Sequence, residues 1–225
     1  MARTARDVLD DAVRTLAPGA GANRLVPLIA AGEAPRAALA ALALEQHHVI
    51  PSDRRAFQHL AQRSVPLGQP AVTDFFDHLA RGEDLALTRL GPFAAACGLT
   101  GDAVRSHEPR FGCQAYPAYV AWLALGAEPV DAVVALTANF AAWGDYCATI
   151  GLALRERYGF DDEACGFFDL FAAPDPEGAE RALAAVGCGL VDGRLSEPLS
   201  HRYGRMLRDH ESLFWSTLAK VAPVE

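Results

Sequence analysis

The stretch Val130–Tyr158, VDAVVALTANFAAWGDYCATIGLALRERY, decides the fold class of this chain. Alanine and leucine dominate it, it contains no proline, and no part of it alternates between apolar and polar residues at the period of a strand. Gly126 precedes it and Gly159 follows it, and glycine commonly ends a helix. The stretch therefore predicts a helix of roughly 28 residues, about 40 Å long at 1.5 Å per residue.

The same helical pattern extends from this stretch in both directions. A second long helix is predicted over Pro35–Arg63, where Pro51 should produce a kink or break near Val49 or Ile50. Shorter helices are predicted over Thr4–Leu16, Asn23–Ala31, Ala71–Arg81, Asp84–Cys97, Tyr116–Leu125, Asp161–Ala172, Pro176–Val191 and Glu197–Val221. No linker or repeat divides the chain, so residues 1–225 are predicted to form one single-domain, all-α helical bundle of about seven or eight main helices.

Composition and charge exclude several classes of partner. The 225 residues are 51% hydrophobic and 21% charged, which is ordinary for a folded globular protein. The net charge is −8, Lys220 is the only lysine and the arginines are scattered, so nucleic-acid binding is not expected. No run of 18 apolar residues occurs, and the N-terminus lacks the apolar core of a signal peptide. Neither membrane insertion nor export is expected.

The five cysteines are widely spaced and form no CxxC pair; they are Cys97, Cys113, Cys147, Cys165 and Cys188. This spacing argues against a disulfide framework and against a zinc-cysteine module. It fits a protein of the reduced cytoplasm, and most of the thiols are interpreted as buried and inert.

Polar residues at apolar helical positions indicate a candidate site, because a buried polar group needs a partner. Glu45 shares a face with Ala38 and Leu42 by i, i+3/i+4 spacing, and Glu211 shares one with Leu207 and Trp215. Further candidates at helical spacing are Asn139, Trp143 and Tyr146 in the long helix, and Tyr116 and Tyr119 in the helix before it.

Two inward carboxylates with an amide and aromatic rings suit a flat, nitrogen-rich and cationic ligand. A buried carboxyl also has a raised pKa and can act as general acid or base near neutrality. Each residue has a simpler interpretation: an inward glutamate is more often bonded to an arginine or a backbone amide, and Trp143 and Tyr146 can be ordinary core residues.

Three segments resemble the TenA/thiaminase II family of the haem-oxygenase-like helical fold, in the family's order and over roughly residues 23–215. Leu44–Val49 (LEQHHV) resembles the family's L-Q-D-x-Y-Y-L segment. Ala115–Tyr119 (AYPAY) resembles the tyrosine-rich segment before the nucleophile helix, and His210–Trp215 (HESLFW) resembles the terminal Y-E-x-x-F-W signature.

The resemblance implies a role for each matching residue. Glu45 would hold an aminopyrimidine ring, and Glu211 would be the acid/base glutamate. His48 would replace a pocket tyrosine, Tyr116 would be one, and Phe171 would stand where another is found. Homo-oligomers are common in the family, so a homodimer or homotetramer is expected.

The chain departs from the family at the nucleophile. Asn139 stands at the position of the family's cysteine, and an amide is not a competent nucleophile. Cys147 lies two turns further along and would serve only if the helix were shifted. We therefore predict that the protein binds or hydrolyses an aminopyrimidine or thiamin-related heterocycle, with Glu211 activating water.

Two other functions remain open. Glu45-x-x-His48, His201 and His210 could belong to a non-haem iron oxidase, although Arg205 and Arg208 occupy two of the ligand positions of such enzymes. A non-catalytic binding or regulatory protein could have kept the pocket. Neither a metal nor another cofactor is expected. Haem oxygenase activity is not expected either, since haem needs an axial histidine near the N-terminus and no histidine precedes His47. No role is assigned to His59, His78 or His107, and Asp53-Arg54-Arg55 is interpreted as a solvated face.

Overall fold

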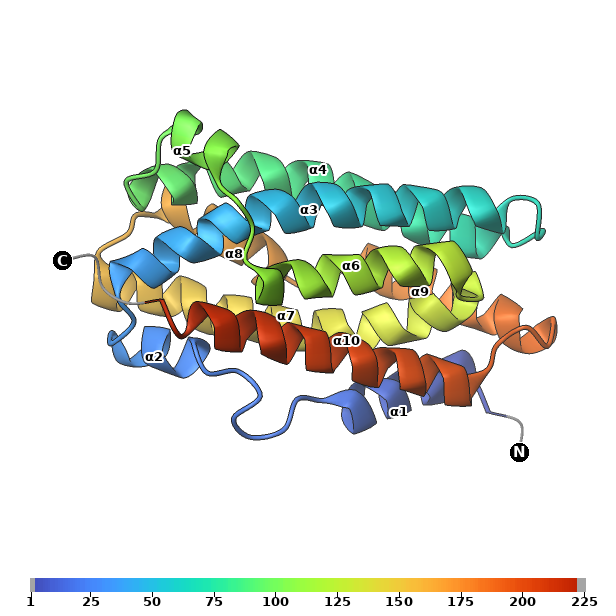
Figure 1. The fold of residues 1–225 in the computed structure, drawn as a ribbon. Helices are drawn as coiled ribbons and strands as arrows, with labels where there is room; N and C mark the ends of the chain where they lie inside the picture. Colours follow the sequence, from blue (N-terminus) through green and yellow to red (C-terminus); the bar gives the residue numbers. More distant parts are fainter. Residues whose placement is uncertain (1–2, 222–225) are drawn as a thin grey trace.

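The computed structural model describes residues 3–221, which are helical almost throughout and contain no strand (Figure 1). The helices are α1 (Ala5–Leu16), α2 (Val26–Ala31), α3 (Arg36–Ser64), α4 (Pro70–Ala96), α5 (Gly101–Ser106), α6 (Phe111–Gly126), α7 (Pro129–Tyr158), α8 (Asp162–Ala172), α9 (Pro176–Val191) and α10 (Glu197–Leu218). The predicted all-α class is confirmed.

Local signals explain most of the helix ends. Thr4 and Asp7 form a capping box at the start of α1, in which each side chain bonds to the other residue's backbone. Glycine ends α7, because Gly159 adopts a left-handed conformation with φ of 72° that side chains other than glycine's disfavour. These signals are encoded within a few residues, so the sequence alone identifies them.

Three expectations about the helices are wrong. The predicted helices over residues 71–81 and 84–97 are one continuous helix, α4, because Gly82 lies within it without breaking it. Likewise α3 runs unbroken past Pro51, so of the two outcomes expected there, a kink or a break, the break does not occur. In addition, α6 begins at Phe111, about one turn before Tyr116, and the short helix α5 was not expected. Gly82 and Pro51 each have buried apolar residues before and after them in the helix, and the packing of these residues keeps the helix continuous.

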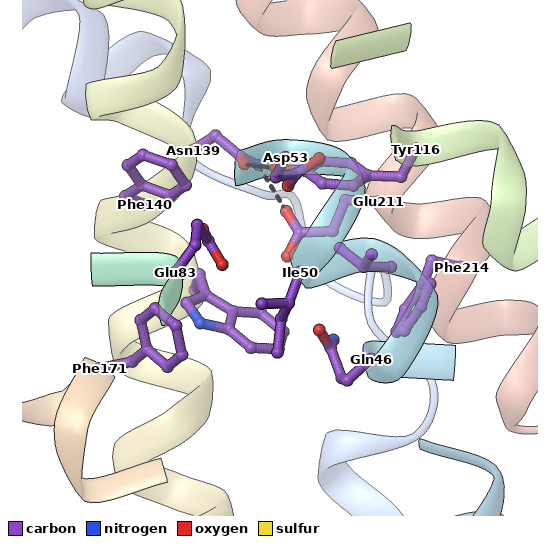
Figure 2. A pocket seen from close by; sticks show the side chains of 12 residues that line it. Gln46, Ile50, Asp53, Glu83, Tyr116, Asn139, Phe140, Phe171, Glu211 and Phe214 are labelled. Atoms are coloured by element: carbon purple, nitrogen blue, oxygen red, sulfur yellow. Dashed lines mark hydrogen bonds between the residues drawn. The ribbon is translucent and has the colours of Figure 1, made fainter. Parts of the chain in front are cut away.

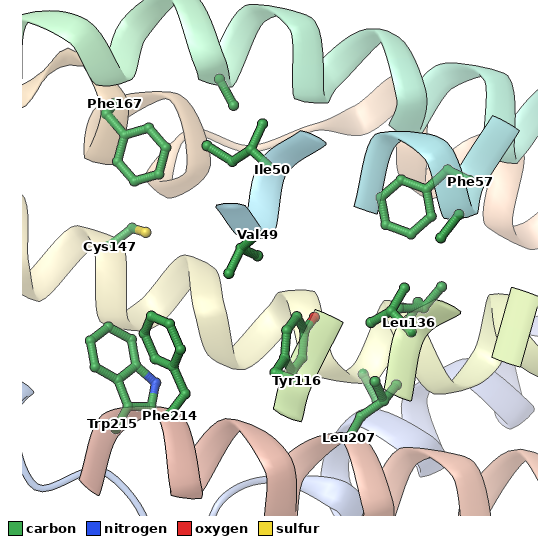
Figure 3. Packing of buried hydrophobic residues seen from close by; sticks show 14 of the residues in the cluster. Val49, Ile50, Phe57, Tyr116, Leu136, Cys147, Phe167, Leu207, Phe214 and Trp215 are labelled. Atoms are coloured by element: carbon green, nitrogen blue, oxygen red, sulfur yellow. The ribbon is translucent and has the colours of Figure 1, made fainter. Parts of the chain in front are cut away.

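The helices pack side by side along one direction, with α3 against α4 and α6 against α10 (Figure 1). Helix α7 contacts α8, α10, α1 and α2, and it lies near the centre of the bundle. A single hydrophobic cluster runs from Val8 in α1 to Leu218 in α10. Figure 3 shows part of it, where Phe57 of α3, Leu136 of α7 and Leu207 of α10 converge.

Two glycines allow helices to approach closely. A β-carbon at Gly189 of α9 would lie 2.6 Å from Val130 Cγ2, and one at Gly204 of α10 would lie 2.4 Å from Leu16 Cδ1. These contacts hold α9 and α10 against the ends of α7 and α1. Among residues 3–221, no helix is both long and apolar enough to cross a membrane.

Candidate functional site

A small internal cavity of about 50 Å³ lies between α3, α4, α6, α7, α8 and α10 (Figure 2). Its wall combines carboxyl, amide and hydroxyl groups with aromatic and aliphatic side chains. The lining residues are Gln46, Val49, Ile50, Asp53, Glu83, Tyr116, Asn139, Phe140, Trp143, Phe171, Glu211 and Phe214. A few polar groups concentrated in an otherwise apolar pocket are typical of a ligand site.

A chain of hydrogen bonds fixes the polar groups of α6, α7 and α10. The Tyr116 hydroxyl donates to Asn139 Oδ1 at 2.8 Å, and Asn139 Nδ2 donates to Glu211 Oε2 at 2.7 Å. The indole Nε1 of Trp215 donates to Glu211 Oε1 at 3.3 Å. Because Tyr116 fixes the orientation of the amide, Asn139 presents its NH₂ group to the carboxyl of Glu211.

Burial raises the pKa of Glu211 to about 7, although the hydrogen bonds from Trp215 and Asn139 favour its ionised form. The side chain is 7% exposed, and the apolar surroundings disfavour a charge more than two hydrogen bonds stabilise it. A carboxyl with this pKa exists in both protonation states near neutral pH. It can therefore give or take a proton in the cavity.

Aromatic rings form one side of the cavity. The rings of Trp143 and Phe171 meet edge to face, with centroids 5.7 Å apart, and Trp143 stacks on Trp215 at the same distance. Phe140 completes this side. The structure thus brings together five of the residues that the sequence singled out: Glu211, Asn139, Tyr116, Trp143 and Phe171.

Glu45 and His48 do not line this cavity. The Glu45 carboxylate is 1% exposed and accepts hydrogen bonds from Arg110 Nη1 at 2.8 Å and from His107 Nε2 at 2.9 Å. His48 contacts the backbone oxygen of His107 at 3.1 Å. Glu45 thus follows the simpler interpretation, an inward glutamate paired with an arginine, and His107 has a structural role that the sequence analysis did not assign.

Tyr119 and Tyr146 also lie outside the cavity. Tyr119 is on the outer face of α6, where its ring stacks on Trp122 at 5.4 Å and lies 4.9 Å from His210. Tyr146 packs edge-on against Trp215 at 5.7 Å, on α7 beyond the cavity lining. The periodicity of α6 and α7 identified their faces correctly but not which part of each face borders the cavity.

Sequence reasoning missed the carboxyl pair of Asp53 and Glu83. Asp53 is 4% exposed, so its interpretation as part of a solvated face is wrong, although its neighbour Arg54 does form a surface ion pair with Asp84 at 2.7 Å. Asp53 follows Gln46 and Val49 at i+7 and i+4, and this spacing is the signal that could have identified it. Glu83 has the same signal, because it lies at i+7 from the buried Phe76 and therefore on the same face of α4.

Cys147 and the residues of the possible iron site are not assembled around the cavity. Cys147 is fully buried in the core on α7, where burial raises its pKa well above the ordinary value (Figure 3). His201 lies near Asp11 on the other side of α10, at 3.8 Å. Within the described part of the chain, no three histidine, cysteine or carboxylate side chains are close enough together to hold a metal ion.

A larger cleft of about 690 Å³ adjoins the cavity between α4, α7, α8 and α9. Glu83, Phe140, Trp143 and Phe171 line both spaces, so they stand at the junction. At the far side of the cleft, His78 Nε2 and Asp175 Oδ2 are 2.8 Å apart. A ligand in the cleft would contact the same four junction residues as a ligand in the cavity.

Three solved structures share the fold. A TenA homologue from P. horikoshii OT3 has a TM-score of 0.68 at 14% identity over 96% of both chains. A TenA homologue from Pseudomonas syringae pv. tomato has a TM-score of 0.73 at 11% identity, covering 96% of this chain and 91% of the other. A Shewanella denitrificans domain of unknown function with a haem-oxygenase-like fold has a TM-score of 0.65 at 16% identity, covering 96% and 87%.

No protein-family model matches the sequence, and no curated protein matches it either. The solved structures confirm the expected fold: the helical bundle of this chain is similar to those of two TenA homologues and of a domain with a haem-oxygenase-like fold.

Proposed function

We propose that the protein binds an aminopyrimidine-type heterocycle in the internal cavity and that Glu211 is the group that exchanges a proton with it. The observation that carries the proposal is the buried carboxyl of Glu211, held by Asn139 and Trp215 beside the aromatic side of the cavity.

The chemistry of an aminopyrimidine matches this carboxyl. A ring nitrogen next to an exocyclic amine offers one acceptor and one donor side by side. A protonated carboxyl can donate to the ring nitrogen through one oxygen and accept from the amine through the other. Each oxygen of Glu211 already accepts one hydrogen bond, and a carboxylate oxygen has a second lone pair for the ligand.

Hydrolysis in this cavity would proceed by attack of water. No cysteine, serine, threonine or lysine is among the residues that line the cavity. Ionised Glu211 would accept a proton from water while the oxygen of that water bonds to the substrate carbon. It would then return the proton to the nitrogen of the leaving amine as the carbon–nitrogen bond breaks. Asn139 would act as a positioning residue, because it holds the carboxyl of Glu211 and contributes no nucleophile.

The test is a fluorescence titration with 4-amino-5-hydroxymethyl-2-methylpyrimidine and with thiamin. Trp143 borders the cavity, so a ligand there should quench its emission saturably. Glu211→Gln should weaken binding about tenfold or more, because an amide cannot transfer a proton to the ring nitrogen and the charge-assisted pair that this transfer creates is lost. Asp209→Asn removes an exposed carboxylate two residues away on the same helix and should leave binding unchanged. No saturable response to either ligand would overturn the proposal.

A further inference from the structure

The carboxyl pair of Asp53 and Glu83 is not explained by the acid/base role of Glu211. Asp53 comes from α3 and Glu83 from α4, and both side chains line the cavity (Figure 2). They are 4% and 9% exposed. Two acidic side chains that are buried in one cavity destabilise a fold unless a proton or a cation accompanies them.

No protein group provides that cation. Oδ1 of Asp53 is buried and has no hydrogen-bond partner among the described residues. The nearest arginine along the chain, Arg54, is engaged with Asp84 on the outside of the bundle at 2.7 Å. Neither the cavity nor the cleft has a lysine or arginine in its lining, over residues 3–221.

A proton can take the place of a cation at the pair, because burial favours the protonated form of a carboxyl over the charged one. Burial raises the pKa of Asp53 and of Glu83 well above their ordinary values, and the charge of Asp53 raises the pKa of Glu83 further. A proton held in this way is replaceable by any cation that can donate hydrogen bonds to both carboxyls.

The surroundings indicate the kind of cation. Glu83 stands at the junction of cavity and cleft, together with the rings of Phe140 and Trp143. Aromatic faces attract organic cations and carry no hydrogen-bonding capacity for a hydrated metal ion. The cleft adds Asp145 and Asp175, and its one histidine, His78, is already paired with Asp175.

We propose that Asp53 and Glu83 form a binding subsite for the ammonium or amidinium group of an organic cation that enters through the cleft. Its N–H groups donate to the two carboxylates, and its carbon frame lies against Phe140 and Trp143. The subsite is on α3 and α4 and does not use Glu211, although its two carboxyls line the same cavity as Glu211.

The test compares benzylamine with benzyl alcohol, which have the same ring and the same length and differ in the charge at neutral pH. Binding of each is followed by Trp143 fluorescence near neutral pH. Wild type should bind benzylamine about tenfold or more tightly than the alcohol. Equal affinities, or no binding of benzylamine, would overturn the proposal without bearing on aminopyrimidine binding by Glu211.

Variants locate the charge that is responsible. Asp53→Asn and Glu83→Gln keep the size of each side chain, and each should reduce the preference for benzylamine about tenfold. Asp145→Asn is the matched control, because it removes an exposed carboxylate from the same cleft. An equal loss in Asp145→Asn would show that only the general negative field attracts the amine, and would overturn the subsite. The wild-type comparison decides the question if a variant fails to fold.

Discussion

The effect of Glu211→Gln on the free energy of unfolding should change sign with pH. The variant should be less stable than wild type at acid pH and more stable at alkaline pH. The pKa of Glu211 rises on folding from 4.5 to about 7, so the folded state holds its proton more tightly than the unfolded state does. Stability therefore falls as the pH increases through this window, because the unfolded chain loses the proton first. Glutamine has no proton to lose and abolishes this dependence.

The magnitude follows from the pKa and the hydrogen bonds. Above about pH 7 the ionised Glu211 lowers the free energy of unfolding by about 3 kcal/mol, and below about pH 4.5 it has no such effect. Glutamine can keep the bond from Asn139 but turns an NH₂ group toward the indole of Trp215, which costs about 1 kcal/mol. Glu211→Gln should therefore be about 2 kcal/mol more stable than wild type at pH 8 and slightly less stable near pH 5.

Urea unfolding followed by circular dichroism, at about pH 5 and about pH 8, measures both differences. The carboxyls of Asp53 and Glu83 titrate in both proteins, so their contribution cancels in the comparison. Asp209→Asn, on the exposed side of α10, should show no reversal. A difference between Glu211→Gln and wild type that is the same at both pH values would refute the assignment of a raised pKa to Glu211.

Three further predictions concern packing and reactivity. Arg110→Ala should lower the free energy of unfolding by about 2 kcal/mol, because it removes a charged donor from the buried Glu45 carboxylate; chemical denaturation measures this, and an unchanged midpoint would contradict it. Gly189→Ala should lower the free energy of unfolding by about 1–3 kcal/mol, since the added β-carbon meets Val130. Gly187→Ala, on the same helix, is the control, because its added β-carbon has its nearest neighbour at 4.0 Å. Thermal unfolding should find this control neutral or slightly stabilising. Cys188 should react with a maleimide within the folded protein while Cys147 stays unmodified, as judged by peptide mass spectrometry; equal labelling would show that the core around Cys147 opens readily.

Local sequence determined the helices and most of their ends. Alanine-rich stretches, the Thr4 capping box and Gly159 act within one or two turns, and their effects need no other part of the chain. Gly82 and Pro51 behave differently, because packing of the apolar residues on either side outweighs the local cost of a breaker. Apparent breaks in a sequence are therefore less reliable than the periodicity around them.

Periodicity likewise identified inward-facing polar residues but not their partners. Glu45 and Glu211 have the same signal, a carboxyl on an apolar helical face. Arg110 is 65 residues away from Glu45 in sequence, and it neutralises that carboxylate. Among the described residues, the side chains that bond to Glu211 are the uncharged Asn139 and Trp215. The helical periodicity of a sequence indicates which face of a helix is buried. It does not indicate which other helix packs against that face.

An all-α bundle with polar residues inside it follows from the order of residues, because helix propensity and periodicity are properties of neighbouring residues. That Asp53 of α3, Glu83 of α4 and Glu211 of α10 line one cavity follows from the packing of the helices. The reason is physical: the pairing of helices depends on how their side chains fit across the core, and such contacts join residues that are far apart in the chain.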